Sequence, residues 1–218
     1  ATYGIEQGGI HTDDVYHHLL RTLHRAKENG HSDRVRLAAL FHDIGKVDTR
    51  RKGKEREYTF FGHDIRSAEL YEGIAERLKT SNEEKYAVSH LIRNHMFSYD
   101  PSWTDSAVRR FITRVGKENI DELIDLRIDD AEAISGRVNP FMLVSLIERI
   151  NKEYERNSAL TLKDLKIKGD DLIREKIINP SPAMGRILNT LLDEVIENPQ
   201  LNERESLLKR ASELAREL

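Results

Sequence analysis

An adjacent histidine and aspartate, His42 and Asp43, stand at the end of an apolar run and are followed by Gly45 and Lys46. An imidazole nitrogen and a carboxylate oxygen together suit a divalent metal ion. Neighbouring residues on a helix point roughly 100° apart, so one ion can contact both side chains only if it lies over their helix. Other segments of the chain must then supply the remaining ligands.

Further histidines and one aspartate lie on other helices that the apolar spacing predicts. His18 lies beside the apolar stripe of the first predicted helix, and His63 opens a later one. His95 falls on the buried face of the next helix, and Asp130 shares a face with two leucines. A buried carboxylate is costly unless it is paired or bound to a metal. Together with the adjacent pair, these residues predict one metal centre built from several helices.

Each of these residues also has a simpler structural interpretation. A single histidine on an apolar face is usually a hydrogen-bonded core residue, and an aspartate there is usually a helix cap or an ion-pair partner. Two neighbours compete for ligand positions, His17 with His18 and Asp129 with Asp130. Helical spacing from the preceding leucines favours Asp130. The occurrence of all the candidates in one chain favours a metal centre over separate structural explanations.

Clustered positive charge lies between these candidates, in a predicted basic loop or small hairpin. Arg50, Arg51 and Lys52 either form a solvated surface or hold a phosphate-rich substrate through paired hydrogen bonds. The aromatic side chains of Tyr58, Phe60 and Phe61 either stack on a base or, as we expect for Phe60 and Phe61, anchor this loop to the core. The sequence therefore places a candidate substrate-binding segment beside the metal centre.

Two further cations have both a functional and a structural interpretation. Lys46 either neutralises phosphate charge or protonates a leaving oxygen, or it serves a helix C-terminus as a cation. Arg127 either binds substrate or forms an ion pair with a nearby aspartate, since arginine is the usual structural partner of carboxylates. The sequence leaves both alternatives open.

The composition predicts a helical protein. The 218 residues include 33% charged and 38% hydrophobic residues, with only 12 Gly and 5 Pro, which is typical of a soluble helical chain. The net charge of −3 gives no global basic field, so any RNA contact would need a local patch. The absence of cysteine excludes disulfides and thiolate zinc sites. No apolar run reaches about 18 residues and no signal peptide is recognisable, so we expect no membrane span and a cytoplasmic location.

Helical spacing with short polar breaks predicts an all-α fold. Residues 136–139, followed by Pro140 at the start of a new helix, form the strongest internal boundary. We therefore expect a helical-bundle domain over residues 1–137, which holds the metal centre, and a smaller helical C-terminal domain over residues 138–218.

The order of the candidate ligands, histidine, histidine–aspartate, histidine, histidine and aspartate, resembles the HD superfamily of metal-dependent phosphohydrolases. The resemblance implies one metal site with four ligands, namely His18, His42, Asp43 and Asp130. It implies that His63 and His95 bind a second metal ion or a substrate phosphate. The segment 126–131 is similar to the family pattern leucine-arginine-x-alanine-aspartate-alanine, which also places Asp130 at the ligand position.

The chemistry implied by this resemblance is hydrolysis of a phosphoester. A divalent ion activates water and polarises a phosphoryl oxygen. Asp43 either bridges two ions or orients the attacking water if only one is bound, and Lys46 assists as a catalytic cation. Nitrogen and carboxylate ligands without sulfur suit one or two ions of Mn, Ni, Co, Fe or Mg.

Longer phrases of the sequence resemble bacterial CCA-adding enzymes and poly(A) polymerases. The phrases similar to the HD region of that family are residues 62–64, 67–70, 77–82 and 103–111. Residues 162–172 and 185–195 resemble its C-terminal segment that contacts RNA. The Gly-Ser and paired-aspartate motifs of the nucleotidyltransferase head are absent, so we expect no nucleotide addition by this chain alone. The chain is then either the C-terminal part of such an enzyme or a stand-alone relative.

Three functions follow from these observations. The leading hypothesis is a divalent-metal-dependent phosphohydrolase, of the phosphatase or 2′,3′-cyclic phosphodiesterase type, that acts on nucleotide or RNA-end phosphoesters. The alternative is the C-terminal RNA-binding part of a CCA-adding or poly(A) polymerase-like nucleotidyltransferase, with tRNA as its partner and a secondary HD site. In a third interpretation the metal ion serves folding alone.

Overall fold

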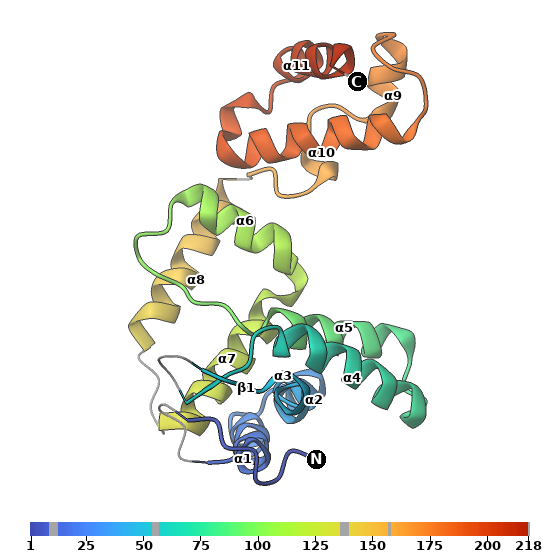
Figure 1. The fold of residues 1–218 in the computed structure, drawn as a ribbon. Coiled ribbons are helices and arrows are strands. Elements are labelled where there is room, and N and C mark those ends of the chain that lie inside the picture. The colour runs from blue at the N-terminus through green and yellow to red at the C-terminus, as the bar shows by residue number, and fades with distance from the viewer. Residues whose placement is uncertain (9–12, 54–56, 136–139, 157, 218) are drawn as a thin grey trace. The chain divides into compact units, whose positions relative to one another are not determined.

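The computed structural model describes residues 1–8, 13–53, 57–135, 140–156 and 158–217. Within these ranges the chain consists of helices joined by turns and loops, with one two-stranded antiparallel hairpin (Figure 1). The predicted all-α fold is therefore confirmed. None of the described helices is long and apolar enough to cross a membrane.

The chain divides into two compact units, which we call unit 1 and unit 2. Unit 1 comprises Ala1–Ser98 and Val115–Pro140, and unit 2 comprises Tyr99–Arg114 and Phe141–Leu218. The expected boundary at residue 137 falls within 136–139, outside the described residues. The units differ from the predicted domains in residues 99–114, which belong to unit 2 because Arg109 on this segment is bonded to its helices. The predicted domain limits stay a prediction.

Unit 1 is a helical bundle around a short helix, α2. Its elements are α1 (Val15–Glu28), α2 (Asp33–Phe41), α3 (Lys46–Thr49), β1 (Arg51–Lys52), β2 (Tyr58–Thr59), α4 (His63–Leu78), α5 (Asn82–Asn94), the 3-10 turn η1 (Lys117–Asn119) and α7 (Ile120–Ser135). Helix α2 packs against α1, α4, α5 and α7. Ser32 fixes its start by accepting a hydrogen bond from the backbone of Val35. The small side chains of Ala38 and Ala39 are fully buried, which lets the surrounding helices approach closely.

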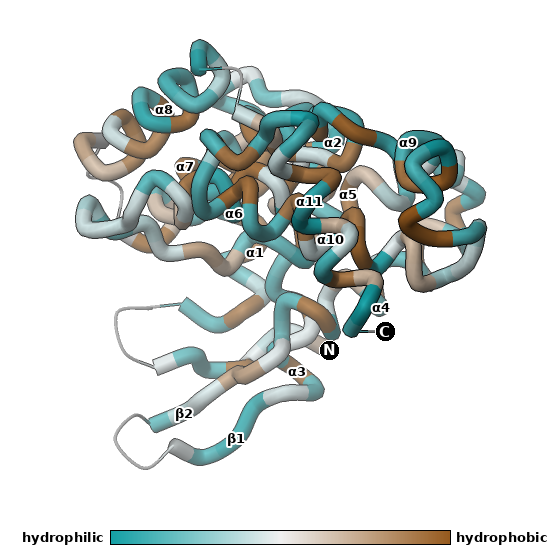
Figure 2. Tube along the Cα trace, turned by 90° about the horizontal axis from the view of Figure 1, so that it is seen from above, coloured by the Kyte–Doolittle hydropathy of each residue, from teal (hydrophilic) through white to brown (hydrophobic). Residues whose placement is uncertain are grey.

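The basic segment between α3 and α4 forms the small hairpin that the sequence allowed. Strands β1 and β2 pair Arg51 with Thr59 and Lys52 with Tyr58. Figure 2 shows β1 in the hydrophilic colour, whereas hydrophobic and hydrophilic bands alternate along the helices. Such alternation is the pattern of helices that bury one face and expose the other.

Unit 2 has its own apolar core. Its elements are α6 (Asp105–Val115), α8 (Pro140–Glu155), the 3-10 turn η2 (Leu162–Asp164), α9 (Gly169–Arg174), α10 (Pro182–Glu197), the 3-10 turn η3 (Pro199–Leu201) and α11 (Arg204–Arg216). Helix α10 is central and packs against η2, α9, η3 and α11. Leu172, Ile187, Leu191, Val195 and Leu207 are buried together in this core.

A candidate metal centre

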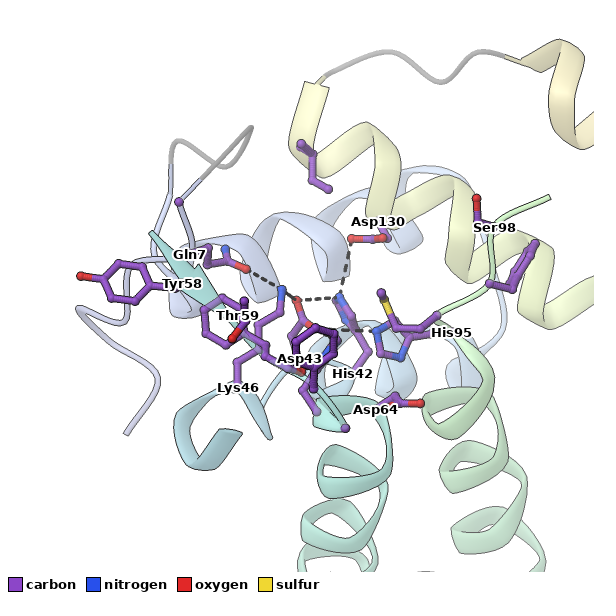
Figure 3. A pocket seen from close by; sticks show the side chains of 18 of the residues that line it. Gln7, His42, Asp43, Lys46, Tyr58, Thr59, Asp64, His95, Ser98 and Asp130 are labelled. Carbon is purple, nitrogen blue, oxygen red and sulfur yellow. Dashed lines mark hydrogen bonds and ion pairs between the residues drawn. The ribbon is translucent and has the colours of Figure 1, made fainter. Parts of the chain in front are cut away.

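The predicted ligands of unit 1 meet at one place, although they come from separate parts of the chain. His18 lies on α1, His42 and Asp43 directly follow α2, and Asp130 lies on α7. His63 is the first residue of α4, and His95 directly follows α5. Figure 3 shows His42, Asp43, His95 and Asp130 pointing toward one another. The structure therefore brings together all six residues that the sequence proposed as metal or phosphate ligands.

Four of these residues place donor atoms at the spacing of a metal coordination shell. The Nε2 atom of His18 lies 3.3 Å from His42 Nε2, 3.5 Å from Asp43 Oδ2 and 3.1 Å from Asp130 Oδ1. His42 Nε2 lies 3.4 Å from Asp43 Oδ2 and 3.6 Å from Asp130 Oδ1. Metal–ligand bonds of about 2.1 Å place neighbouring donors roughly 3.0 to 3.4 Å apart in octahedral and tetrahedral shells. Two overlapping sets, His18 with His42 and Asp130, and His42 with Asp43 and His95, each place one donor atom per residue within 4.8 Å of one another.

The second carboxylate oxygen of Asp43 faces the other two histidines. Its Oδ1 atom lies 3.1 Å from His63 Nε2 and 3.7 Å from His95 Nε2. Among the described residues, neither Asp43 Oδ1 nor His63 Nε2 makes a hydrogen bond, although both atoms are buried. Buried polar atoms that make no hydrogen bond are rare, and a cation between these two atoms would satisfy both of them. Asp43 is thus placed to contribute one oxygen to each of two cation sites.

Backbone carbonyls fix the orientation of three of the histidine rings. The Nδ1 atom of His42 lies 2.9 Å from the carbonyl oxygen of Ala39. The Nδ1 atoms of His63 and His95 each lie 2.7 Å from a carbonyl oxygen, that of Phe60 and that of Ile92 respectively. Each of these carbonyls belongs to the residue three positions earlier. When Nδ1 donates its proton to a carbonyl, Nε2 is left as the acceptor that can bind a metal ion. All three Nε2 atoms face the cluster, as a metal centre requires.

The ionisable groups of the cluster shift one another's pKa values. Burial alone would lower the pKa of His42, but the nearby carboxylates of Asp43 and Asp130 outweigh it and raise the pKa to about 10. Burial would raise the pKa of both carboxyl groups, but Lys46 and His42 hold that of Asp43 well below its usual value, and His18 and His42 do so for Asp130. Burial and the charge of His42 lower the pKa of His95 to about 4. The carboxylates and His95 are thus ready to bind a cation, whereas His42 must first lose a proton.

Lys46 lies inside the cluster and has an unexpected partner. Its Nζ atom donates to Asp43 Oδ2 at 2.6 Å and to Gln7 Oε1 at 2.7 Å, and it lies 5.5 Å from the centre of the Phe60 ring (Figure 3). Lys46 begins α3, so it does not serve as a cation at the C-terminus of α2. Gln7 could not be identified from the sequence, because one glutamine in an irregular segment gives no pattern.

Gly45 allows α4 to approach the metal centre. A Cβ atom on Gly45 would lie 2.6 Å from both the carbonyl oxygen of His63 and the backbone nitrogen of Ser67. The backbone N–H of Gly45 instead donates to Ser67 Oγ at 2.8 Å. This contact joins the segment after α2 to the first turn of α4, and it brings His63 within reach of Asp43.

The two residues that competed for ligand positions lie outside the cluster. His17 is 55% exposed, and its Nδ1 lies 2.7 Å from Asp14, the N-cap of α1. Asp129 is fully buried and accepts from Asn29 Nδ2 at 2.9 Å, with His31 Nδ1 2.8 Å away. Both therefore have local structural partners.

The cluster opens onto a cavity of about 770 Å³. Arg127 lines this cavity and donates to Asp130 Oδ2 at 2.7 Å, so the ion pair that the sequence allowed is present. The cavity wall also includes apolar side chains, namely Phe60, Phe61, Met96, Phe97 and Ile134. Phe61 is 89% exposed, so the expectation that it anchors the loop to the core is wrong. The two aromatic residues follow β2 directly, and only the first of them packs inward.

The basic residues of the hairpin do not line the cavity. The guanidinium of Arg50 lies 3.6 Å from the centre of the Tyr58 ring, and its Nη2 is 3.5 Å from Glu6. Arg51 donates to backbone carbonyls of its own turn, and Lys52 is exposed on β1. The role of these three residues in substrate binding stays a prediction.

Comparisons with known proteins point to enzymes that act on tRNA. The model of a family described as "tRNA nucleotidyltransferase domain 2 putative" matches residues 55–211. An A-adding tRNA nucleotidyltransferase of Deinococcus radiodurans is 28% identical over 197 residues, which cover 87% of this chain and 44% of that protein. A CC-adding tRNA nucleotidyltransferase of Thermus thermophilus is 28% identical over 198 residues, which cover 89% of this chain and 44% of that protein. A multifunctional CCA protein of Burkholderia orbicola is 34% identical over 97 residues, which cover 44% of this chain and 23% of that protein.

The matches cover a larger share of this chain than of its relatives. The first two relatives match over most of this chain, yet this chain spans only 44% of the length of each of them. No solved structure matches this chain.

Proposed function

The chain belongs to the tRNA nucleotidyltransferase domain 2 family, and we propose that it binds tRNA as the C-terminal part of a nucleotide-adding enzyme. The observation that carries this proposal is the family match over residues 55–211, supported by two relatives that are named for adding nucleotides to tRNA. The chain lacks the Gly-Ser and paired-aspartate motifs expected of a nucleotidyltransferase head. We therefore assign tRNA binding, rather than nucleotide addition, to this chain.

The packing of unit 2 supports this proposal. Its segments 162–172 and 185–195 resemble an RNA-contacting tail, and they pack together because η2 and α9 both contact α10. A Cβ atom on Gly169 at the start of α9 would lie 3.1 Å from Met184 of α10. Exposed cations of unit 2 include Lys163, Lys168, Lys176, Arg186, Lys209 and Arg216. Such cations supply the local positive charge that phosphate contacts need.

Salt-dependent binding tests the tRNA proposal. We expect fluorescently labelled tRNA to bind at low salt. The logarithm of its association constant should fall linearly with the logarithm of the salt concentration. The charge reversal Lys163→Glu with Arg186→Glu should reduce the slope by about 2, one for each lost phosphate contact. The control reverses the same charge on exposed cations of unit 1, Lys27→Glu with Arg77→Glu, and should leave the slope nearly unchanged. No binding at low salt, or equal losses in both variants, would refute the assignment.

We also propose a second function for unit 1, the metal-dependent hydrolysis of nucleotide or RNA-end phosphoesters by an HD-type site. The specific observation in its favour is the set of donor atoms spaced 3.1 to 3.6 Å apart, next to two buried atoms without hydrogen bonds, at a cavity of about 770 Å³. A divalent ion bound there would supply the Lewis acid for a phosphoryl oxygen.

The roles of the chain's own residues follow from their positions. The residues that would hold the ion are His18, His42, Asp43 and Asp130. His63 and His95 would hold a second ion or a phosphate group. Lys46 can donate a proton or a hydrogen bond to a phosphate or leaving oxygen beside Asp43, and Arg127 adds positive charge to the cavity wall. The apolar wall can shield the reacting group from bulk water.

Hydrolysis of 2′,3′-cyclic AMP tests this second function. Metal-stripped protein is titrated with Mn, Ni, Co and Mg, and one of these ions should restore turnover. Asp43→Ala and His42→Ala should each reduce the rate of turnover by at least about 10³-fold, because each removes a ligand of the catalytic metal ion. Asp48→Ala, which removes an exposed aspartate nearby, is the control. Turnover that survives both ligand variants would refute a hydrolytic site, whereas loss of helical structure on chelation without any turnover would favour a metal ion that serves folding alone.

A further inference from the structure

The N-terminal segment, residues 1–8, is anchored beside the candidate metal centre. The backbone N–H of Val15 donates to Ile5 at 3.0 Å, and that of Gly4 donates to Asp14 Oδ2 at 2.7 Å. Gln7 itself donates from Nε2 to the Asp13 carbonyl at 3.3 Å and is 5% exposed. These bonds hold a buried glutamine at the cavity wall, at the end of a segment that the sequence did not connect with the site.

Gln7 and Asp43 share the ammonium group of Lys46. The Nζ atom lies 2.7 Å from Gln7 Oε1 and 2.6 Å from Asp43 Oδ2 (Figure 3). The same Asp43 oxygen lies 3.4 and 3.5 Å from the Nε2 atoms of the two histidines with which it would bind an ion. An ammonium group and a divalent ion on one carboxylate oxygen repel each other. Lys46 and a metal ion therefore compete for Asp43.

We propose that Gln7 is a positioning residue, whose Oε1 atom holds Lys46 inside the cavity when a divalent ion occupies Asp43 Oδ2. The amide oxygen is the polar acceptor already bonded to Lys46 besides Asp43, and it carries no charge that would bind the ammonium group permanently. Lys46 can thus release Asp43 without leaving the site, where it remains available to a phosphate group. This inference rests on the proposed metal site of unit 1.

The competition predicts opposite effects for substitutions of the two residues. Lys46→Met removes the rival cation and leaves Asp43 without its nearest positive charge, so the protein should bind a divalent ion more tightly. Gln7→Met leaves Lys46 with Asp43 as its main partner, so the protein should bind the ion more weakly. If Gln7 acts only through Lys46, the double variant should bind as Lys46→Met does.

Calorimetric titration of the metal-stripped chain with Mn²⁺ tests these effects without reference to turnover. Because outer-sphere partners typically change metal affinity by about 10- to 100-fold, we expect Lys46→Met to tighten binding by about 10-fold and Gln7→Met to weaken it by several-fold. The double variant should match Lys46→Met within about two-fold. Gln200→Met, which changes the other glutamine of the sequence on unit 2, is the matched control and should bind as the wild type does.

The possible results separate this inference from the metal site on which it rests. Wild-type protein that binds no Mn²⁺ would overturn both. Wild-type binding that Gln7→Met leaves unchanged would overturn the role of Gln7 alone. If Gln7→Met weakens Mn²⁺ binding equally in the wild type and in the Lys46→Met variant, Gln7 supports the local fold instead. This result too would overturn the proposal. Thermal unfolding of each metal-free variant checks that the helices remain folded.

Discussion

Both units bury ionisable side chains, but the partners of these side chains differ. In unit 2 the guanidinium of Arg109 donates to Glu153 at 3.0 Å and to two backbone carbonyls at the end of α10, at 2.6 and 3.2 Å. Glu153 in turn accepts from Arg156 and Ser158, both at 2.8 Å. In unit 1, by contrast, Asp43 Oδ1 and His63 Nε2 are buried without a hydrogen bond among the residues that the structure describes.

This contrast separates a structural use of buried charge from a functional one. The bonds of Arg109 tie α6 to α8 and α10, and no space for a ligand is needed to explain them. The cluster in unit 1 lies at a cavity, and two of its buried atoms make no hydrogen bond among the described residues, which is a costly arrangement unless a cation satisfies them. Burial of a charge alone therefore does not indicate function; an incomplete set of partners does.

The largest effect that would test this contrast is expected from Arg109→Leu. The change leaves Glu153 buried with an incomplete set of partners, and breaking a buried ion pair costs about 3 to 5 kcal/mol. Urea unfolding followed by the fluorescence of Trp103, the single tryptophan, reports on unit 2, where this ring contacts Phe111.

The neighbouring residue provides the matched control for this prediction. Arg110 is 63% exposed and pairs with Glu197, so Arg110→Leu should cost less than about 1 kcal/mol. A similar cost for both arginines would contradict the view that the network of Arg109 holds unit 2 together.

Metal binding should stabilise unit 1 and leave unit 2 unaffected. At a free Mn²⁺ concentration of 100 times Kd, the expected gain in the free energy of unfolding is about 2.7 kcal/mol. Hydrogen exchange should slow in α2 and α5 but not in α10. Asp130→Asn should abolish this gain, whereas the adjacent change Asp129→Asn should retain it.

The two aspartates differ because only Asp130 contacts the histidine cluster. Asp129 bonds Asn29 and lies beside His31, so Asp129→Asn should lower the stability of unit 1 equally with and without metal. Equal protection of α10 by Mn²⁺, or a gain that survives Asp130→Asn, would contradict a metal centre confined to the cluster.

A smaller effect is expected where the site depends on close backbone packing. Gly45→Ala would force apart the segment after α2 and the start of α4, and such overpacking costs about 1 to 3 kcal/mol. Gly73 in the middle of α4 has no atom near its Cβ position, so Gly73→Ala should stabilise the protein by about 0.5 to 1 kcal/mol. Thermal unfolding followed by circular dichroism in chelator measures both changes. Two alanine variants of equal stability would show that the close approach at Gly45 is dispensable.

The helices and the candidate ligands could be predicted from the sequence because both depend on periodic patterns. Apolar spacing placed His95 on a buried face and preferred Asp130 to Asp129, and the structure puts Asp130 with the histidines and Asp129 elsewhere. The boundary of the units was harder to predict because residues 99–114 join unit 2 through tertiary contacts, such as those of Arg109.

Other parts of the site have no signature in a single sequence. Gln7 reaches the cluster through an irregular segment, and the carbonyl that orients His63 belongs to a loop before α4. Clustered positive charge in the sequence suggested Arg50 as a substrate residue, but the structure stacks its guanidinium on Tyr58. Charge and residue type can be read from a sequence, whereas the direction of a side chain depends on packing.

Proton release gives the smallest effect and the most direct distinction between the two units. His42 has a pKa of about 10 in the metal-free chain because two carboxylates outweigh its burial, so it is protonated at pH 7. A metal ion binds only the unprotonated nitrogen, so its binding must release this proton, and affinity should rise by up to about ten-fold per pH unit until the pH approaches 10. His95, with a pKa of about 4, should release none.

Calorimetry in buffers of different ionisation enthalpy counts the protons released at pH 7. We expect at least one proton for the wild type, and the same number for Asp129→Asn, which leaves the contacts of His42 intact. Release of no proton would mean that His42 is neutral before the metal ion binds or is not a ligand. Either explanation would remove the contrast between the cluster of unit 1, which needs a cation, and the Arg109 network of unit 2, which is already complete.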